Sequence, residues 1–327
     1  MKGDERVLDS TTAFGARGGS RYFMNGRLMT GPDYLRGLGS LAMILIPSVL
    51  LDVFVIPGFD PVGSLITYLV LIPVQLLSMG LLLGTIYSNP GVLPRQRPYT
   101  EHYDFLNREY RSRAPEKFQD FIINCEPVRM KFCGTCGIYR PPRCSHCSVC
   151  DNCVDKFDHH CPWVGNCIGR QNYQRFFFFV LFTALLTLGS MAVCISLLIV
   201  ETNVNDDGSR TKGEAFLKTL REYPLSMAIL IYCTLLSWFT VGLGGYHTFL
   251  VMKGISTNEQ IKGHLDKHNP YSSGPVRNLL ALLKFRPMDK AFFNGNQLGS
   301  LPPLRKAFRE VPADNPEPIS LSKLSIN

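Results

Sequence analysis

Four long apolar stretches constrain the fold of this chain more than any other feature of its sequence. Each lacks Lys, Arg and Glu over 19 to 27 residues, and they cover residues 38–56, 65–87, 176–200 and 225–251. A helix of about 20 residues crosses the hydrocarbon core of a bilayer. Buried helices of a soluble protein would show a polar face at helical spacing, and the last three stretches show none. The sequence therefore predicts an α-helical polytopic membrane protein with four transmembrane helices.

The first stretch is the least regular of the four, because it contains Pro47 and Asp52. Asp52 lies near its end, close to the expected membrane surface, where a carboxyl is tolerated, and we assign it no function. Upstream lie 37 mostly polar residues, so no cleavable signal peptide is expected before this stretch.

The distribution of Lys and Arg predicts the orientation in the membrane. Six precede the first stretch, none separates the first two, 13 lie between the second and third, four between the third and fourth, and 11 follow. Basic residues are enriched on the cytosolic side. We therefore predict a cytosolic N-terminal segment (1–37), helices 1 and 2 (38–87), a cytosolic loop (88–175), helices 3 and 4 (176–251) with a luminal loop (201–224), and a cytosolic tail (252–327). The net charge of +8 is then mostly cytosolic, with much of it close to the membrane, and it predicts contact with anionic lipid and no nucleic-acid partner.

The loop between the second and third helices contains a metal-ligand pattern written twice, fourteen residues apart. Both copies read C-x2-C-x9-H-x6-C; the ligands are Cys133, Cys136, His146 and Cys153 in the first set and Cys147, Cys150, His160 and Cys167 in the second. Three thiols and one imidazole are a ligand mix that tetrahedral Zn²⁺ takes in structural sites. We therefore predict two structural Zn²⁺ ions in a small cysteine-rich module (about 131–175). Their binding would supply folding energy to a loop with few large apolar runs.

Two other interpretations compete at this point. A disulfide framework fits poorly, because the loop is predicted to face the reducing cytosol. The module could also be two catalytically inert zinc knuckles that bind partner proteins. Against this, Cys144, His159 and Cys161 remain outside both ligand sets, and Cys161 has a surplus His two residues away.

Cys161 is the candidate nucleophile. His159 can take the thiol proton, and Asp158 can orient the imidazole and stabilise its charged form. The third apolar stretch opens only fifteen residues later, which places the thiol close to the membrane surface. A thiol there can accept a fatty acyl group from a thioester such as acyl-CoA.

This segment resembles the DHHC-type protein S-acyltransferase (palmitoyltransferase) family. The resemblance includes the Asp158–Cys161 motif, the paired zinc pattern and the order of two spans, cysteine-rich loop, two spans and tail. It also includes Asn89-Pro90-Gly91, Ser256-Thr257-Asn258-Glu259, and Asn269-Pro270-Tyr271. Upstream, Asn25-Gly26-Arg27-Leu28 resembles the entry sequence of Golgi and plant-type members. Two positions depart from the family pattern: Asn89 replaces an Asp and Ser256 replaces a Thr.

The resemblance implies a ping-pong enzyme. Cys161 would be acylated by palmitoyl-CoA and then pass the palmitoyl group to cysteines of substrate proteins near the membrane. His159 and Asp158 carry over as general base and orienting partner, the two Cys3His sets as zinc sites, and Thr257 as a residue that approaches Asp158. The bilayer and an accessory subunit are further candidate partners, and a Golgi or ER membrane is expected. The identity of the substrates and the acyl length lie beyond these motifs.

Overall fold

The structure is a computed structural model of the chain. It describes residues 18–24, 26–95, 102–104, 109–111, 116–123, 126–206, 211–263, 269–284 and 309–310. Asn25, the first residue of the Golgi-type entry sequence, lies outside the described residues. The chain divides into two compact parts, one formed by residues within 16–93 and 143–288, the other by described residues within 94–142 and 309–310.

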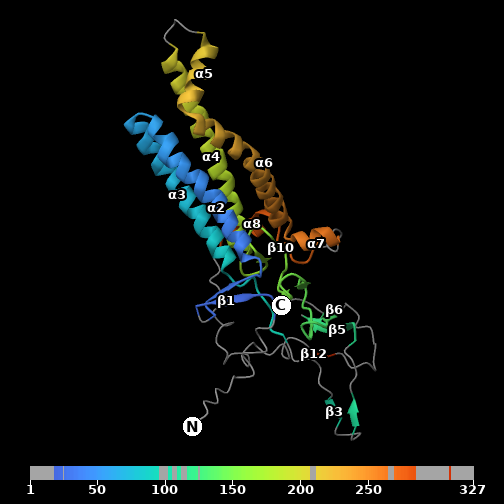
Figure 1. Cartoon of the computed structure of the whole chain (residues 1–327). Helices are drawn as coiled ribbons and strands as arrows, with labels where there is room; N and C mark the ends of the chain where they lie inside the picture. Colours follow the sequence, from blue (N-terminus) through green and yellow to red (C-terminus); the bar gives the residue numbers. More distant parts are fainter. Residues whose placement is uncertain are drawn as a thin grey trace, which may run out of the picture. The chain divides into compact units, whose positions relative to one another are not determined.

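Four long apolar helices form the bulk of the first part and run side by side (Figure 1). They are α2 (Tyr34–Leu50, continued by the π-helix η1, Leu51–Val55, and the 3-10 turn η2, Ile56–Gly58), α3 (Pro61–Ile86), α4 (Tyr173–Asn205) and α6 (Pro224–Lys253). Each is long and apolar enough to cross a membrane. The four-span architecture expected from composition is confirmed, and the chain is a multi-pass integral membrane protein.

The turn between α2 and α3 is specified by its own residues. Asp60 accepts hydrogen bonds from the backbone N–H groups of Val62 (3.0 Å) and Gly63 (3.1 Å), and Pro61 occupies the first helical position. A side-chain acceptor before the helix and a proline at its first position both favour a helix start. The two helices therefore pack as an antiparallel hairpin.

Asp52 has a partner that its position in the sequence does not reveal. It lies in the π-helical turn of the first span, and its carboxylate accepts a hydrogen bond from Gln75 Nε2 on α3 (3.0 Å). The Tyr68 hydroxyl donates to the Asp52 carbonyl (2.6 Å). A polar group in a bilayer needs such partners because lipid offers none. Asp52 therefore joins the first two spans.

The cysteine-rich segment of the first part is two tight hairpins. β8 (Ser145–Cys147) pairs with β9 (Asn152–Val154), and β10 (His159–Cys161) pairs with β11 (Asn166–Ile168). Asn166 Nδ2 donates to the carbonyls of Ile86 (3.1 Å) and Ser88 (2.9 Å), which lie at and just beyond the end of α3. The Ser40 hydroxyl of α2 donates to the Trp163 carbonyl (2.7 Å). These bonds fix the second hairpin against one end of the helical bundle.

Shorter elements complete the first part. They are the pair β1 (Arg21–Phe23) and β2 (Leu28–Thr30), and the helices α5 (Lys212–Glu222), α7 (Thr257–Lys262) and α8 (Pro275–Leu283). In the other part, β12 (Arg309–Glu310), β5 (Phe118–Ile123), β6 (Glu126–Cys133) and β7 (Ile138–Tyr139) form a sheet in that order, and β3 (His102–Asp104) pairs with β4 (Glu109–Arg111).

Candidate active site and zinc centres

The β10 strand sends neighbouring side chains to opposite faces, because residues alternate across a strand. His159 and Cys161 share one face. His160 lies on the other face and is directly opposite Cys167 in the register of β10 with β11. The extended geometry expected for this segment is present, and it separates the surplus His–Cys pair from the proposed zinc ligands.

The second Cys3His set converges in the structure. His160 Nδ1 lies 3.4 Å from Cys150 Sγ and 3.7 Å from Cys167 Sγ, and the two sulfurs are 3.4 Å apart. With Cys147, the four ligand atoms all lie within 4.8 Å of one another. The three cysteines are buried.

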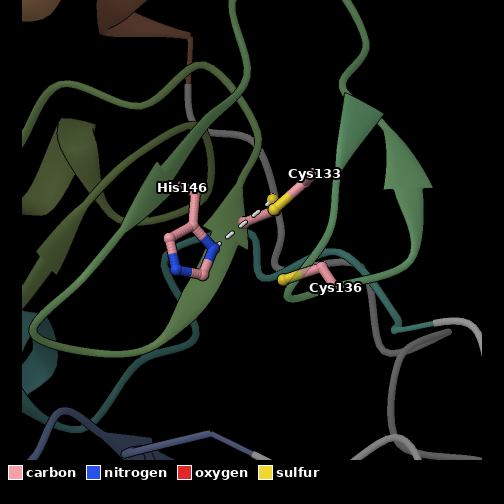
Figure 2. Close-up of side chains that lie close together, drawn as sticks. Cys133, Cys136 and His146 are labelled. Carbon is pink, nitrogen blue, oxygen red and sulfur yellow. Dashed lines mark hydrogen bonds between the residues drawn. The ribbon is translucent and has the colours of Figure 1, made fainter. Parts of the chain in front are cut away.

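The first set converges in the same way. The ligand atoms of Cys133, Cys136, His146 and Cys153 also lie within 4.8 Å of one another. His146 Nδ1 is 3.8 Å from Cys153 Sγ. Figure 2 shows the side chains of Cys133, Cys136 and His146 directed toward one another.

Both donor sets fit zinc. Hydrogen bonds from Cys150 and Cys167 hold the pKa of Cys147 far below its usual range, while the bonds to Cys147 and Cys150 raise the pKa of Cys167. Without a cation, one thiolate in this buried cluster therefore opposes the ionisation of the next thiol. A divalent cation would offset that repulsion, and three thiolates with one imidazole give Zn²⁺ its tetrahedral coordination. The chain therefore contains two Cys3His zinc-binding clusters.

On the other face of β10, His159 forms a short pair with Asp158. His159 Nδ1 donates to Asp158 Oδ2 (2.6 Å), which leaves Nε2 for Cys161. Asp158 is almost completely buried, with 1% of its surface exposed. The Thr257 backbone N–H donates to Asp158 Oδ1 (2.9 Å), and the Thr257 hydroxyl donates to Oδ2 (2.8 Å). The expected approach of Thr257 to Asp158 is confirmed.

These contacts set the charges of the pair. Burial alone would raise the pKa of Asp158, but the hydrogen bond and charge of His159 and the Thr257 N–H keep it below its usual range. Burial lowers the pKa of His159, whereas its interactions with Asp158 and Cys161 outweigh burial and raise that pKa to about 9. His159 is therefore an imidazolium at neutral pH, next to a carboxylate that balances its charge.

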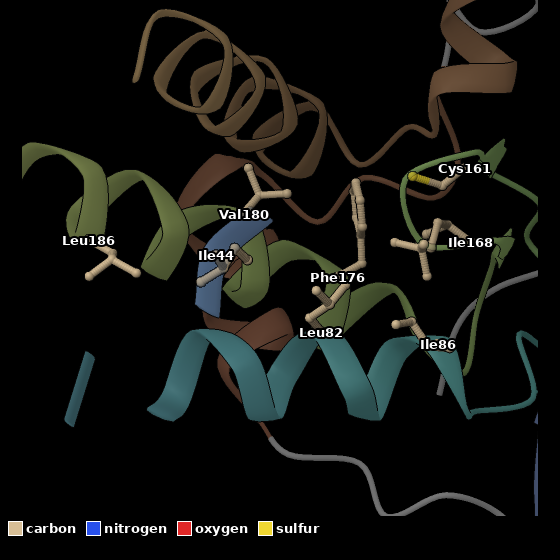
Figure 3. Close-up of a cluster of buried hydrophobic side chains, with 9 residues drawn as sticks. Ile44, Leu82, Ile86, Cys161, Ile168, Phe176, Val180 and Leu186 are labelled. Atoms are coloured by element: carbon tan, nitrogen blue, oxygen red, sulfur yellow. The ribbon is translucent and has the colours of Figure 1, made fainter. Parts of the chain in front are cut away.

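Cys161 lies outside both zinc sets and inside a hydrophobic cluster. The other members of this cluster are buried side chains of α2, α3, α4 and the second hairpin: Ile44, Leu82, Ile86, Val164, Ile168, Phe176, Val180 and Leu186. Figure 3 shows Cys161 and Leu186 at opposite ends of this cluster. The thiol is thus placed where the apolar interior of the helical bundle begins.

Sequence reasoning did not connect His247 with this site. A ligand atom of His247, on α6, lies within 4.8 Å of those of Asp158 and His159. A hydrogen bond joins His247 Nδ1 to the Tyr173 hydroxyl (3.0 Å). Phe176 packs edge-on against both imidazoles, with ring centroids 5.3 Å from His159 and 5.0 Å from His247. The only indication of this role in the sequence was that His247, an ionisable residue, lies inside an apolar span.

The two residues that depart from the family pattern, Asn89 and Ser256, both form hydrogen bonds to the backbone through their side chains. Asn89 Oδ1 accepts hydrogen bonds from the N–H groups of Gly91 and Val92 (both 2.8 Å), which an Asp carboxylate oxygen could also accept. The Ser256 hydroxyl caps α7 and donates to the Phe157 carbonyl (3.1 Å). Cys144 is partly buried and belongs to neither metal cluster.

Comparisons with known proteins agree with this site. Residues 126–264 match the family model described as DHHC palmitoyltransferase. Human palmitoyltransferase ZDHHC18 is 37% identical over 283 residues, which cover 81% of this chain and 69% of that protein. Human palmitoyltransferase ZDHHC14 is 37% identical over 284 residues (79% and 54%), and bovine palmitoyltransferase ZDHHC9 is 42% identical over 214 residues (62% and 56%). The chain thus spans about half the length of human ZDHHC14 and bovine ZDHHC9.

Proposed function

Because this chain belongs to the DHHC palmitoyltransferase family, we propose that it is a protein S-acyltransferase that moves a palmitoyl group from palmitoyl-CoA to cysteine thiols of substrate proteins. One observation carries the proposal. Cys161 belongs to neither zinc cluster and lies on the same face of β10 as His159. It also lies at the end of an apolar cluster inside the helical bundle.

The first step forms an acyl-enzyme on Cys161. His159 holds the thiol proton, and the Cys161 thiolate attacks the thioester carbonyl of palmitoyl-CoA. The bond between the carbonyl carbon and the CoA sulfur breaks, and His159 returns its proton to the departing CoA thiolate. Asp158, fixed by Thr257, balances the charge of the imidazolium before that return.

The second step repeats this chemistry with a different thiol. His159 takes the proton of a substrate cysteine, whose sulfur attacks the acyl carbonyl on Cys161. The bond to Cys161 Sγ breaks, and Cys161 leaves as the thiol or thiolate. Exchange of one thioester for another needs little driving force, so both steps are reversible. The position of Cys161 favours substrate cysteines close to the membrane.

The acyl chain would follow the apolar cluster away from Cys161. Leu186 and Gly189 on α4 are our candidates for residues that set its length. Leu186 ends the cluster, and a Cβ at Gly189 would lie 3.0 Å from Leu71 Cδ2, which leaves little room there. Shortening Leu186 should therefore shift the preference toward longer acyl chains.

The zinc ions would be structural. The two Cys3His sets would hold them, and bound zinc would supply folding energy that fixes the hairpins. Cys161, His159 and Asp158 remain free for chemistry, because none belongs to either Cys3His set.

The orientation and compartment are further parts of the proposal. The Lys and Arg distribution supports cytosolic termini and a cytosolic cysteine-rich loop, where acyl-CoA is found. The entry sequence that ends in Gly26-Arg27-Leu28 supports a Golgi or ER membrane. An accessory subunit is a candidate partner. Protease protection of tagged termini in sealed vesicles tests the orientation.

The decisive experiment is mass spectrometry of the purified chain after incubation with palmitoyl-CoA. We expect one palmitoyl adduct on Cys161 that hydroxylamine removes, and no such adduct in Cys161→Ser. Zinc in Cys161→Ser should stay near two per chain, because Cys161 is not a ligand. Full transfer activity in Cys161→Ser would refute the assignment. An unmodified wild-type chain with two zinc ions would instead favour an inert zinc module that binds partner proteins.

A further inference from the structure

The two ring nitrogens of His160 face different groups. Nδ1 points at the sulfurs of the second zinc cluster, 3.4 Å from Cys150 and 3.7 Å from Cys167. Nε2, on the opposite edge of the ring, is buried and has no hydrogen-bond partner among the described residues. A carboxylate oxygen of Asp33 nevertheless lies 3.4 Å from it. At that separation the carboxylate faces Nε2 without the alignment of a full hydrogen bond.

Asp33 is the residue before α2, where an aspartate usually caps the helix with its side chain. Here the side chain makes no capping hydrogen bond. Its carboxylate lies between Arg36 Nη1 (3.3 Å) and His160 Nε2 (3.4 Å). The backbone of Asp33 is pressed against Gly165, which has a φ of +70° and no room for a Cβ. The carboxylate thus lies beside the zinc hairpin and makes no capping hydrogen bond to the helix.

The same arrangement occurs at the other zinc cluster. His146 Nδ1 faces Cys153 Sγ at 3.8 Å, and His146 Nε2 lies 3.5 Å from Asp151 Oδ1. Asp151 has a φ of +49°, a left-handed conformation that aspartate adopts more readily than most residues. Two histidines from two hairpins therefore each direct Nδ1 to sulfur and Nε2 to an aspartate. A carboxylate on the far nitrogen of a metal-bound histidine fixes its tautomer and orientation and makes it a better ligand.

We infer that Asp33 is the outer carboxylate of the second zinc centre and holds His160 with Nδ1 toward the metal and Nε2–H toward the carboxylate. Asp151 does the same for His146 at the first centre. The inference rests on zinc occupying the Cys3His sets and is independent of acyl transfer. Because Asp33 immediately precedes α2, it also makes the first membrane span part of the zinc centre.

Asp33 has 27% of its side chain exposed and Asp151 has 45%, so water screens the contact of Asp33 with His160 less than that of Asp151 with His146. We therefore expect the larger effect at Asp33.

Zinc release from the zinc-loaded 327-residue chain in detergent tests this assignment. Zinc per chain is measured first, and release to a coloured chelator is then followed in time. Asp33→Ala should speed the release of one of the two ions by about 10- to 100-fold, because losing such an outer partner typically lowers metal affinity by about that factor. Asp33→Asn keeps an acceptor oxygen without charge, and its rate should fall between those of Asp33→Ala and the wild type. Asp151→Ala should speed the release of the other ion, so that the double variant releases both quickly.

Arg36→Ala is the matched control. It removes the other partner of the same carboxylate and leaves the His160 contact intact, so its release rate should equal that of the wild type. Equal release rates for Asp33→Asn, Asp33→Ala and the wild type would overturn the inference, as would equal acceleration by Arg36→Ala. If Asp33→Ala does not load zinc, the Asp33→Asn rate decides. A wild-type chain that binds fewer than two zinc ions would refute the premise, whatever the outcome for acyl transfer.

Discussion

His159 and His160 are neighbours on β10 with different expected roles, because a strand turns successive side chains to opposite faces. His159→Ala should slow acylation of Cys161 by about 10²–10⁴-fold, the usual cost of losing a general acid–base group. Its zinc content should stay near two. His160→Ala should lose one zinc ion together with activity, because it removes a ligand of the second cluster. Metal analysis and the rate of adduct formation measure both variants.

The pH dependence of the two variants separates the roles further. Raising the pH forms thiolate without a base, so His159→Ala should recover part of its acylation rate. His160→Ala should not recover, because its defect is structural. The opposite pattern, with zinc lost in His159→Ala and kept in His160→Ala, would mean that the fourteen-residue repeat pairs the wrong histidine with zinc.

At the same scale, Thr257 is a positioning residue for Asp158. Thr257→Val removes the hydroxyl bond to Oδ2 and keeps the backbone bond to Oδ1. A hydrogen bond to a charged group contributes about 1.5–3 kcal/mol. We expect kcat for acylation to fall by about tenfold or more, with little change in KM for palmitoyl-CoA, because the substrate site is not touched. Thr257→Ser keeps both bonds and should retain most of the rate; equal losses in the two variants would point to packing instead.

At the scale of elements, the short helix α7 is joined to the cysteine-rich hairpins by a buried ion pair. Arg143 donates to both carboxylate oxygens of Glu259 (2.6 and 2.5 Å), and both side chains are 9% exposed. The Glu259 side chain also accepts from the Ser256 backbone N–H (2.7 Å). This pair brings the start of α7, and with it Thr257, to Asp158.

Removing one partner of this pair should be costly. Glu259→Gln leaves the Arg143 charge buried without its counter-charge, and breaking such a pair costs about 3–5 kcal/mol. We expect a lower Tm for the detergent-solubilised chain and a loss of acylation. Ile261→Ala, on the exposed side of the same helix, is the control and should change neither. An unchanged Tm in Glu259→Gln would show that α7 is held by its other contacts.

At the scale of the whole molecule, the helical bundle and the zinc hairpins depend on different forces. The bundle is apolar along its length, whereas the hairpins have only three residues per strand and few apolar side chains. A chelator that removes zinc should therefore expose the segment around residues 143–170 to protease, while the four long helices keep their circular dichroism signal. Proteolysis followed by mass spectrometry locates the cuts. Identical cleavage with and without zinc would refute a structural role for the metal.

Sequence and structure contributed differently to the site. The four spans could be predicted from composition, because a bilayer requires about 20 consecutive apolar residues whatever their neighbours are. The two ligand sets and the Asp158–Cys161 group could be predicted from local spacing, because all of them lie within 35 consecutive residues.

Contacts made across the fold were not predictable in the same way. Asp33 lies 127 residues before His160 in the sequence and contacts it, and His247 lies 87 residues after His160 and approaches Asp158 and His159. Asp52 in the first span forms a hydrogen bond with Gln75 in the second. No periodicity in the sequence encodes such encounters, since they depend on how whole helices pack. The sequence alone determined which groups are available for zinc and for chemistry. Only the tertiary structure decided which distant side chains orient them, because orientation needs contacts between elements that the chain order keeps apart.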